Sequence, residues 1–251
     1  MSEPFARSPK PFLVKKDNPF TFESLVGKLG QAITHFPDKR TGTNRRYSLK
    51  QVALSAFSLF FTQNASFLQF QKDMARAKGK SNAQTLFQIE PIPSENQIRN
   101  LLDEVSPELV YQVFTEIFDT LNEHQYLEDY RRINGDLLIA VDGTHYHSSR
   151  SICCQNCNVT NHRNGTVTYF HQAIMPVVVV PGNNTVISLE PEFITPQDGH
   201  DKPDCEHEAM KRWLLKHGAH YRPVGVTILG DDLYCDQPRC LAIREAGFNF
   251  I

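Results

Sequence analysis

The stretch LLIAVDGT, residues 137–144, decides the fold class of this chain. It is a short apolar run of β-forming residues that leads directly into Asp142. A second run of the same kind, VGVTILG at residues 224–230, leads into Asp231. Apolar runs this short and this rich in β-formers predict buried strands. Each aspartate therefore follows residues that a hydrophobic core would hold rigid.

The sequence around these two strands predicts an α/β domain over residues 131–251. Segments 166–180 and 184–194 are rich in β-branched residues and are separated by a Pro-Gly-Asn-Asn turn. Helices are expected through 201–218 and 238–247, closed by Gly218 and Gly247, before a final strand, FNFI. The expected element order is β-β-β-α-β-α-β, in a mixed sheet.

Residues 1–130 are expected to form a helical region. Ser48 with Gln51, and Ser94 with Gln97, are capping-box pairs. Asn64 is the expected cap of a helix through FLQFQKDMARA, and Ser106-Pro107 starts a helix with an apolar stripe around Phe118. The short turn between the second and third helices is compatible with a DNA-reading helix-turn-helix and equally with any small helical bundle.

Composition places the chain among folded globular proteins, with 40% hydrophobic and 22% charged residues in 251. Its longest apolar stretch, residues 52–61, is far shorter than the roughly 20 residues of a membrane span. The N-terminus lacks a secretory signal pattern, so we expect a cytoplasmic protein with reduced cysteines. The formal charge of −2 gives no general support for nucleic-acid binding, although residues 1–50 hold ten Lys or Arg against four Asp or Glu.

Asp142 and Asp231 are the candidate catalytic and metal-binding residues. Ligands gather where the strands of an α/β sheet end, and two carboxylates brought together there repel unless a divalent cation lies between them. Oxygen ligands on rigid strands suit Mg²⁺ or Mn²⁺, which can support in-line attack on a phosphodiester. Taken singly, each aspartate can equally be a turn former that caps backbone amides at a strand end.

The same residues carry a family resemblance. AVDGTHYHSS, from Ala140, resembles the first-aspartate region of IS4-type bacterial insertion-sequence transposases. ILGDDLYCDQPRCLAIREAGFNFI, from Ile228, resembles their second-aspartate region, with Asp231 as the catalytic residue, Asp232 at a variable position and Tyr234 in the motif. The resemblance spans roughly residues 90–251.

The resemblance implies an RNase H-like fold and a DDE transposase that cleaves double-stranded DNA at element ends and joins it to a target. It also implies a homo-oligomer that bridges two DNA ends. The family's third carboxylate is a Glu on a helix beyond the last strand seen here, so we expect the chain to be a fragment carrying two of the three. Glu245 has the wrong spacing for that role.

Cysteines and histidines cluster after the first aspartate. Cys154 and Cys157 form a CxxC, and soft thiolates with an imidazole can hold Zn²⁺. His162 is our predicted third ligand, with His171 and Cys205 as alternatives; reduced, partly buried cysteines are the other interpretation. The histidines that follow Asp142 most closely are His145 and His147. They fit either a contact with a phosphate or exposed positions on a strand.

Two other functions remain open at this point. One is a non-catalytic DNA-binding remnant that regulates the complete transposase, which would bind DNA even after Asp142→Ala. The other is a zinc-dependent hydrolase built on the cysteines and histidines, which would tolerate Asp231→Ala. The absence of GxGxxG and GxxxxGK[ST] patterns disfavours a nucleotide-binding protein.

Overall fold

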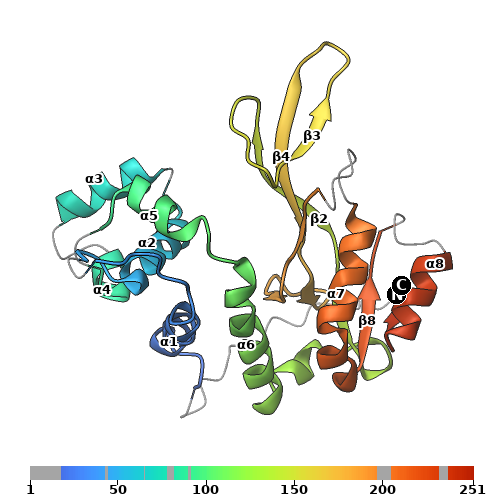
Figure 1. Cartoon of the computed structure of the whole chain (residues 1–251). Helices are drawn as coiled ribbons and strands as arrows, with labels where there is room; N and C mark the ends of the chain where they lie inside the picture. The colour runs from blue at the N-terminus through green and yellow to red at the C-terminus, as the bar shows by residue number, and fades with distance from the viewer. Residues whose placement is uncertain are drawn as a thin grey trace, which may run out of the picture. The chain divides into compact units, whose positions relative to one another are not determined.

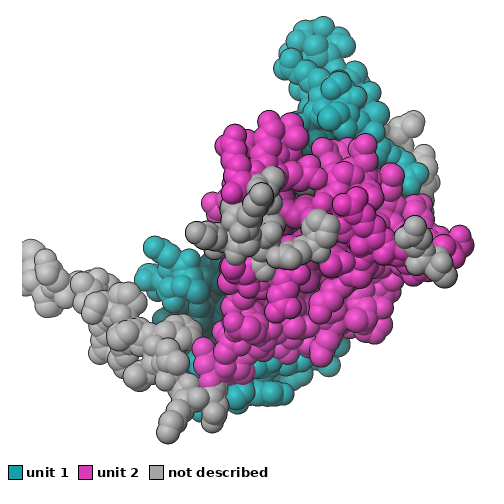
Figure 2. Space-filling model, turned by 90° about the vertical axis from the view of Figure 1, so that its left-hand side faces the viewer, with its two compact units in different colours: residues 1–9, 117–251 teal, residues 10–116 magenta. Residues whose placement is uncertain are grey.

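The computed structural model describes residues 18–42, 45–64, 66–77, 82–89, 92–196, 205–231 and 237–251. Asp232 and Tyr234 of the second predicted motif, and the first residues of the basic N-terminal segment, lie outside these ranges. The chain divides between Glu116 and Ile117 into two compact units. The first unit in chain order is residues 10–116, magenta and keyed as unit 2 in Figure 2, and the second unit is residues 117–251, teal and keyed as unit 1.

The first unit is helical. Both predicted capping boxes are present, because the Ser48 and Ser94 side chains each accept the backbone N–H of the glutamine three residues later. A small core gathers Ile33, Leu54 and Phe87 from three helices. Its elements are α1 (Phe22–Ile33), α2 (Leu49–Phe61), α3 (Phe67–Ala77), α4 (Asn82–Phe87), α5 (Glu95–Leu102), the 3-10 turn η1 (Pro107–Val110) and the first half of α6 (Tyr111–Glu123).

One predicted cap is wrong. The residue that caps α3 is Ser66, whose hydroxyl accepts the backbone N–H of Gln69 at 3.2 Å. Asn64 instead donates its side-chain amide to the Thr62 hydroxyl. The turn between α2 and α3 is therefore longer than the sequence suggested, because the cap of α3 is Ser66 and not Asn64.

The second unit is built on a five-stranded sheet with the order β6-β5-β1-β8-β9. β1 is antiparallel to β5 and parallel to β8; β5 and β6 are antiparallel, and β8 and β9 are parallel. In chain order this sheet, with the two helices that lie between its later strands, reads β-β-β-α-β-α-β, but the unit also holds four strands that the predicted order omits. The strands are β1 (Leu137–Ala140), β5 (Val177–Val179), β6 (Ile187–Ser188), β8 (Val226–Leu229) and β9 (Asn249–Phe250).

A second sheet, which the sequence did not reveal, has the order β2-β4-β3 with β7 paired to β4. The expected single strand 166–180 is split at Pro176 into β4 and β5, and the expected strand 184–194 is split at Pro191 into β6 and β7. Because proline cannot donate to a ladder, each split sends the chain from one sheet to the other. The added strands are β2 (Gly143–Ser149), β3 (Asn158–Asn161), β4 (Val167–Ile174) and β7 (Glu192–Ile194). Figure 1 shows β3 and the outer part of β4 projecting from the rest of the unit.

Two helices share the core of the five-stranded sheet, α7 (Glu206–Tyr221) and α8 (Gln237–Glu245). Trp213 is fully buried there. Gly247 ends α8 with a left-handed φ of 88°, as predicted. Gly218 does not end α7: the helix continues to Tyr221, and the missing side chain lets the Phe248 ring pack against it.

The second unit is mixed α/β, and the helical first unit precedes it in the chain. The 3-10 turns η2 (Tyr126–Tyr130), η3 (Ile133–Gly135) and η4 (Arg222–Val224) complete the second unit. Within the described ranges, none of the helices combines the length and the apolar character needed to cross a bilayer.

Candidate functional site

Asp142 and Asp231 end neighbouring strands at the same edge of the five-stranded sheet. β1 and β8 are parallel partners, with Ala140 opposite Leu229. The backbone N–H of Val141 extends the ladder by donating to the Leu229 carbonyl at 3.0 Å. Each aspartate lies two positions beyond its paired residue, so both follow the C-terminal ends of this parallel pair. Both side chains are exposed.

The turn from β1 into β2 fixes the backbone of Asp142. Its Oδ1 accepts the N–H of Gly143 at 2.8 Å, and its carbonyl accepts the N–H of Met175 at 3.1 Å. These two bonds hold the backbone of Asp142 in place, and they leave its second carboxylate oxygen, Oδ2, available as a ligand atom. The arrangement suits an oxygen ligand on a rigid support.

Glu206, which the sequence analysis did not single out, adds a third carboxylate at this edge. It is the first residue of α7, and its Oε1 accepts the side-chain amide of Gln172 at 2.6 Å. A Cβ atom at Gly143 would overlap this carboxylate, so glycine is what allows Glu206 to approach the residue after Asp142. A helix start in an acidic stretch was visible in the sequence, but nothing local connected it with a strand 60 residues earlier.

Two buried glutamates, Glu190 just before β7 and Glu192 at its first position, bond to side chains of α7. Glu192 is 5% exposed and receives the Arg212 guanidinium at 2.7 Å and the Lys216 ammonium at 3.0 Å. Glu190 is 1% exposed and accepts the Tyr221 hydroxyl at 2.6 Å. Burial, and after it the Glu190 carboxylate, raises the pKa of Tyr221 well above its usual range. These contacts hold the helix that presents Glu206.

The CxxC lies on the projecting second sheet. The Cys154 and Cys157 sulfurs are 3.8 Å apart, and each is 3.4 Å from Nε2 of His171 in β4. Burial raises the pKa of the Cys157 thiol, and burial followed by the charge of His147 lowers the pKa of His171. The neutral ring that this favours is the form of histidine that binds metals.

The structure corrects one predicted ligand. His162 lies at the end of the hairpin between β3 and β4, where its Nε2 is 2.8 Å from the Thr168 hydroxyl. The β3–β4 register pairs Asn158 with Phe170, which carries Cys157 to the level of His171. The residue that joins the cysteines is therefore His171, which sequence spacing offered only as an alternative.

His145 and His147 both belong to β2. The His145 ring is stacked on Phe170, with centroids 4.6 Å apart and planes 14° apart. His147 is instead the register partner of His171 and lies with its ring centroid 5.8 Å away. The nearer neighbours of both rings are thus residues of β4.

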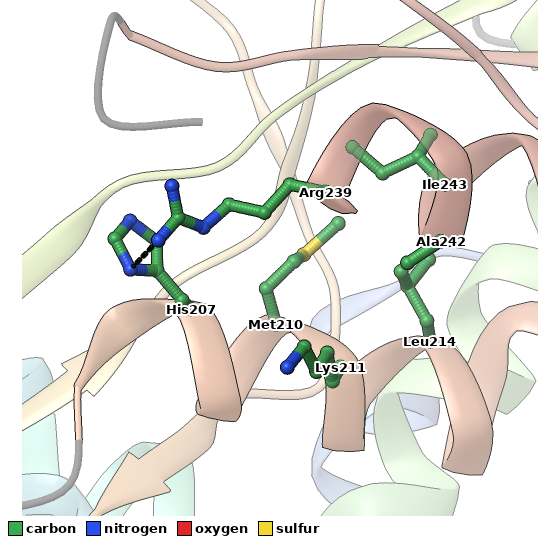
Figure 3. Close-up of a pocket in the computed structure, with 7 residues that line it drawn as sticks. All are labelled: His207, Met210, Lys211, Leu214, Arg239, Ala242 and Ile243. Atoms are coloured by element: carbon green, nitrogen blue, oxygen red, sulfur yellow. Dashed lines mark hydrogen bonds between the residues drawn. The ribbon is translucent and has the colours of Figure 1, made fainter. Parts of the chain in front are cut away.

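A hollow between α7 and α8 is too small for an organic ligand. It encloses about 10 Å³, roughly the room that one water molecule needs. Figure 3 shows Arg239 reaching from α8 to Nδ1 of His207 on α7, at 2.6 Å. The lining residues are His207, Met210, Lys211, Leu214, Arg239, Ala242 and Ile243.

Comparisons with known proteins place this chain in no family. No protein-family model matches it, and no curated protein matches it significantly. Among solved structures it is similar to a chain in the crystal structure of a pre-cleavage Mos1 transpososome, with 12% identity and a TM-score of 0.21, over 85% of this chain and 61% of that one. The chain thus spans less than two thirds of the Mos1 chain, and so low a TM-score carries no argument about fold or function.

Proposed function

We propose that this chain carries the RNase H-like catalytic core of an IS4-type DDE transposase, in which Asp142 and Asp231 hold Mg²⁺ or Mn²⁺ for phosphodiester cleavage and strand transfer. The observation that carries the proposal is the parallel β1–β8 register, which aligns the two aspartates at one sheet edge. The element order β-β-β-α-β-α-β of the five-stranded sheet supports it.

The donor set fits a hard divalent cation. Two exposed carboxylates and a third from Glu206 supply only oxygen atoms, which Mg²⁺ and Mn²⁺ prefer over nitrogen or sulfur. One cation at this edge would activate the attacking water or 3′-hydroxyl, and a second would stabilise the leaving oxygen. The aspartates would fix the position of the cation.

Double-stranded DNA is the proposed substrate. Because the side chains are exposed at the end of the sheet, the edge is open to a large polymer and needs no enclosed pocket. Phosphate oxygens of the strand would then complete the coordination of the cation, as carboxylates alone leave positions for substrate.

The test is cleavage of supercoiled plasmid DNA by the purified chain with Mg²⁺ or Mn²⁺. Asp142→Asn and Asp231→Asn should each lower the rate roughly 100-fold or more, because a catalytic metal supplies several kcal/mol of charge stabilisation. Asp129→Asn, an identical change at an exposed aspartate in η2, is the matched control and should keep the wild-type rate. Cleavage at the same rate by the wild type and by all three variants would overturn the proposal.

A further inference from the structure

The spacing of Cys154, Cys157 and His171 is that of a tetrahedral zinc site. With Zn–S bonds of about 2.3 Å and a Zn–N bond of about 2.05 Å, tetrahedral angles put two sulfurs about 3.8 Å apart and each sulfur about 3.6 Å from the nitrogen. The protein has 3.8 Å between the sulfurs and 3.4 Å from each to Nε2. A disulfide would need about 2.05 Å between the sulfurs, so the pair is a dithiol.

The turn between the two cysteines and the pairing of β3 with β4 create this spacing. The tight turn between the cysteines is closed by the Cys157 N–H, which donates to the Cys154 carbonyl at 3.2 Å. The Cys154 N–H in turn points at the Cys157 sulfur, also at 3.2 Å, and such a donor stabilises a thiolate. His171 arrives from β4 through the β3–β4 pairing, and the Tyr146 ring is stacked on it with centroids 5.6 Å apart.

A fourth ligand is at hand on the opposite strand. His147 pairs with His171 in the β2–β4 ladder, so the two side chains stand on the same face of the sheet. Their ring centroids are 5.8 Å apart, which makes His147 a neighbour of the three atoms that already lie within 4.8 Å of one another. A Cys₂His₂ set closes a structural zinc site.

The surroundings explain why a metal would be useful there. In β2 and β3 most residues are exposed or only partly buried, and among the described residues neither strand contributes to the main hydrophobic core. A small structure with little core is commonly held by a metal ion or by disulfides. The site lies about 16 Å along β2 from Asp142, so it is separate from the carboxylate edge.

We propose that Cys154, Cys157, His171 and His147 bind one Zn²⁺, which fastens the 150–157 loop to β2 and β4 and gives the projecting sheet a fixed shape. Binding displaces the two thiol protons to solvent, and no redox change is involved. The proposal does not rest on the proposed function, because it concerns different residues and a different metal.

The experiment measures metal content and coordination in the full chain. Purified under reducing conditions with zinc present, the wild type should retain one zinc per chain after dialysis. Replacing zinc by Co²⁺ should produce a thiolate-to-cobalt charge-transfer band and the intense visible bands of a tetrahedral ion. Loss of all zinc on dialysis, or an octahedral cobalt spectrum, would overturn the proposal. Because both measurements use the wild-type chain, the result does not depend on whether a variant folds.

Variants assign the ligands. The double variant Cys154→Ser with Cys157→Ser, and His171→Ala alone, should lose the zinc, whereas His162→Ala, a histidine of the same hairpin, should retain it. His147→Ala should weaken zinc binding and alter the visible cobalt bands while preserving the charge-transfer band. Zinc retained by the double variant, or lost equally from His162→Ala, would contradict the assignment. A cobalt spectrum unchanged by His147→Ala would remove His147 from the set.

Discussion

The two sheets of the second unit are stabilised in different ways. In the five-stranded sheet, β1 and β8 are buried almost throughout and carry oxygen donors at their ends. In the second sheet, β2 and β3 are mostly exposed, the two sulfur donors lie in the loop that joins them, and the His171 imidazole lies in β4. Hydrophobic burial can hold the first sheet rigid without a metal, so its edge is free for substrate chemistry. Among the described residues, β2 and β3 contribute none to that core, which is why we assign this part of the second sheet a structural ion.

The largest effect should follow from removing core volume under the first sheet. Ile139 in β1 is fully buried, and Ile139→Ala should lower the free energy of unfolding by about 2–5 kcal/mol through lost burial and a residual cavity. Val159 in β3 is 42% exposed, so Val159→Ala should change it by roughly 0.5 kcal/mol or less. Urea unfolding of both variants measures this. Equal losses would mean that the two sheets do not differ as described.

The junction between the sheets gives the second prediction. Glu192 in β7 pairs with Arg212 and Lys216 of α7, and Glu192→Gln would leave both cations facing a buried neutral group. We expect a loss of roughly 1–3 kcal/mol, because Glu192 is buried while its partners reach solvent. Glu208→Gln breaks an exposed pair with Lys211 and should cost about 0.5 kcal/mol or less. Urea midpoints that shift alike in the two variants would show that burial does not strengthen the Glu192 contacts.

A smaller effect, with a defined pH dependence, is expected at Tyr221. Tyr221→Phe should cost about 1 kcal/mol at neutral pH, because Glu190 loses the phenol that donates to it. The pKa of Tyr221 is raised in the folded protein, so its contribution is fully present below the unfolded-state pKa of about 10 and is lost as the pH rises beyond it. Between about pH 8 and 11, the free energy of unfolding should therefore fall less steeply with pH for the variant than for the wild type. Parallel curves would contradict the assigned contact.

Local signals in the sequence predicted much of the local structure, although Asn64 did not cap α3 and Gly218 did not end α7. The capping boxes at Ser48 and Ser94 need only residues three positions apart, and both formed. Gly247 ended its helix for the same kind of reason, since its left-handed φ depends on the adjacent backbone alone. The apolar runs before Asp142 and Asp231 became buried strands, because no other environment suits so many β-branched and aliphatic residues in sequence.

What depended on pairing between distant segments could not be predicted. Pro176 splits a continuous β-forming run, but only the partner strands decide that its halves join different sheets. His171 reaches the cysteines because of one register among several that the sequence allows. Glu206 approaches Gly143 because α7 packs against β7, a segment far from Gly143 in the sequence. In each case the deciding contact lies outside the window in which a motif can be read.

The most direct test of the central claim is Mn²⁺ binding to the reduced, zinc-loaded chain, followed by electron paramagnetic resonance. With the soft-ligand site already filled, wild-type protein should bind Mn²⁺ at the carboxylate edge. Asp142→Asn and Asp231→Asn should each weaken that binding at least roughly tenfold, the equivalent of about 1.4 kcal/mol, while Asp129→Asn should bind as tightly as the wild type. Equal affinity in all four proteins would contradict a shared cation site at Asp142 and Asp231.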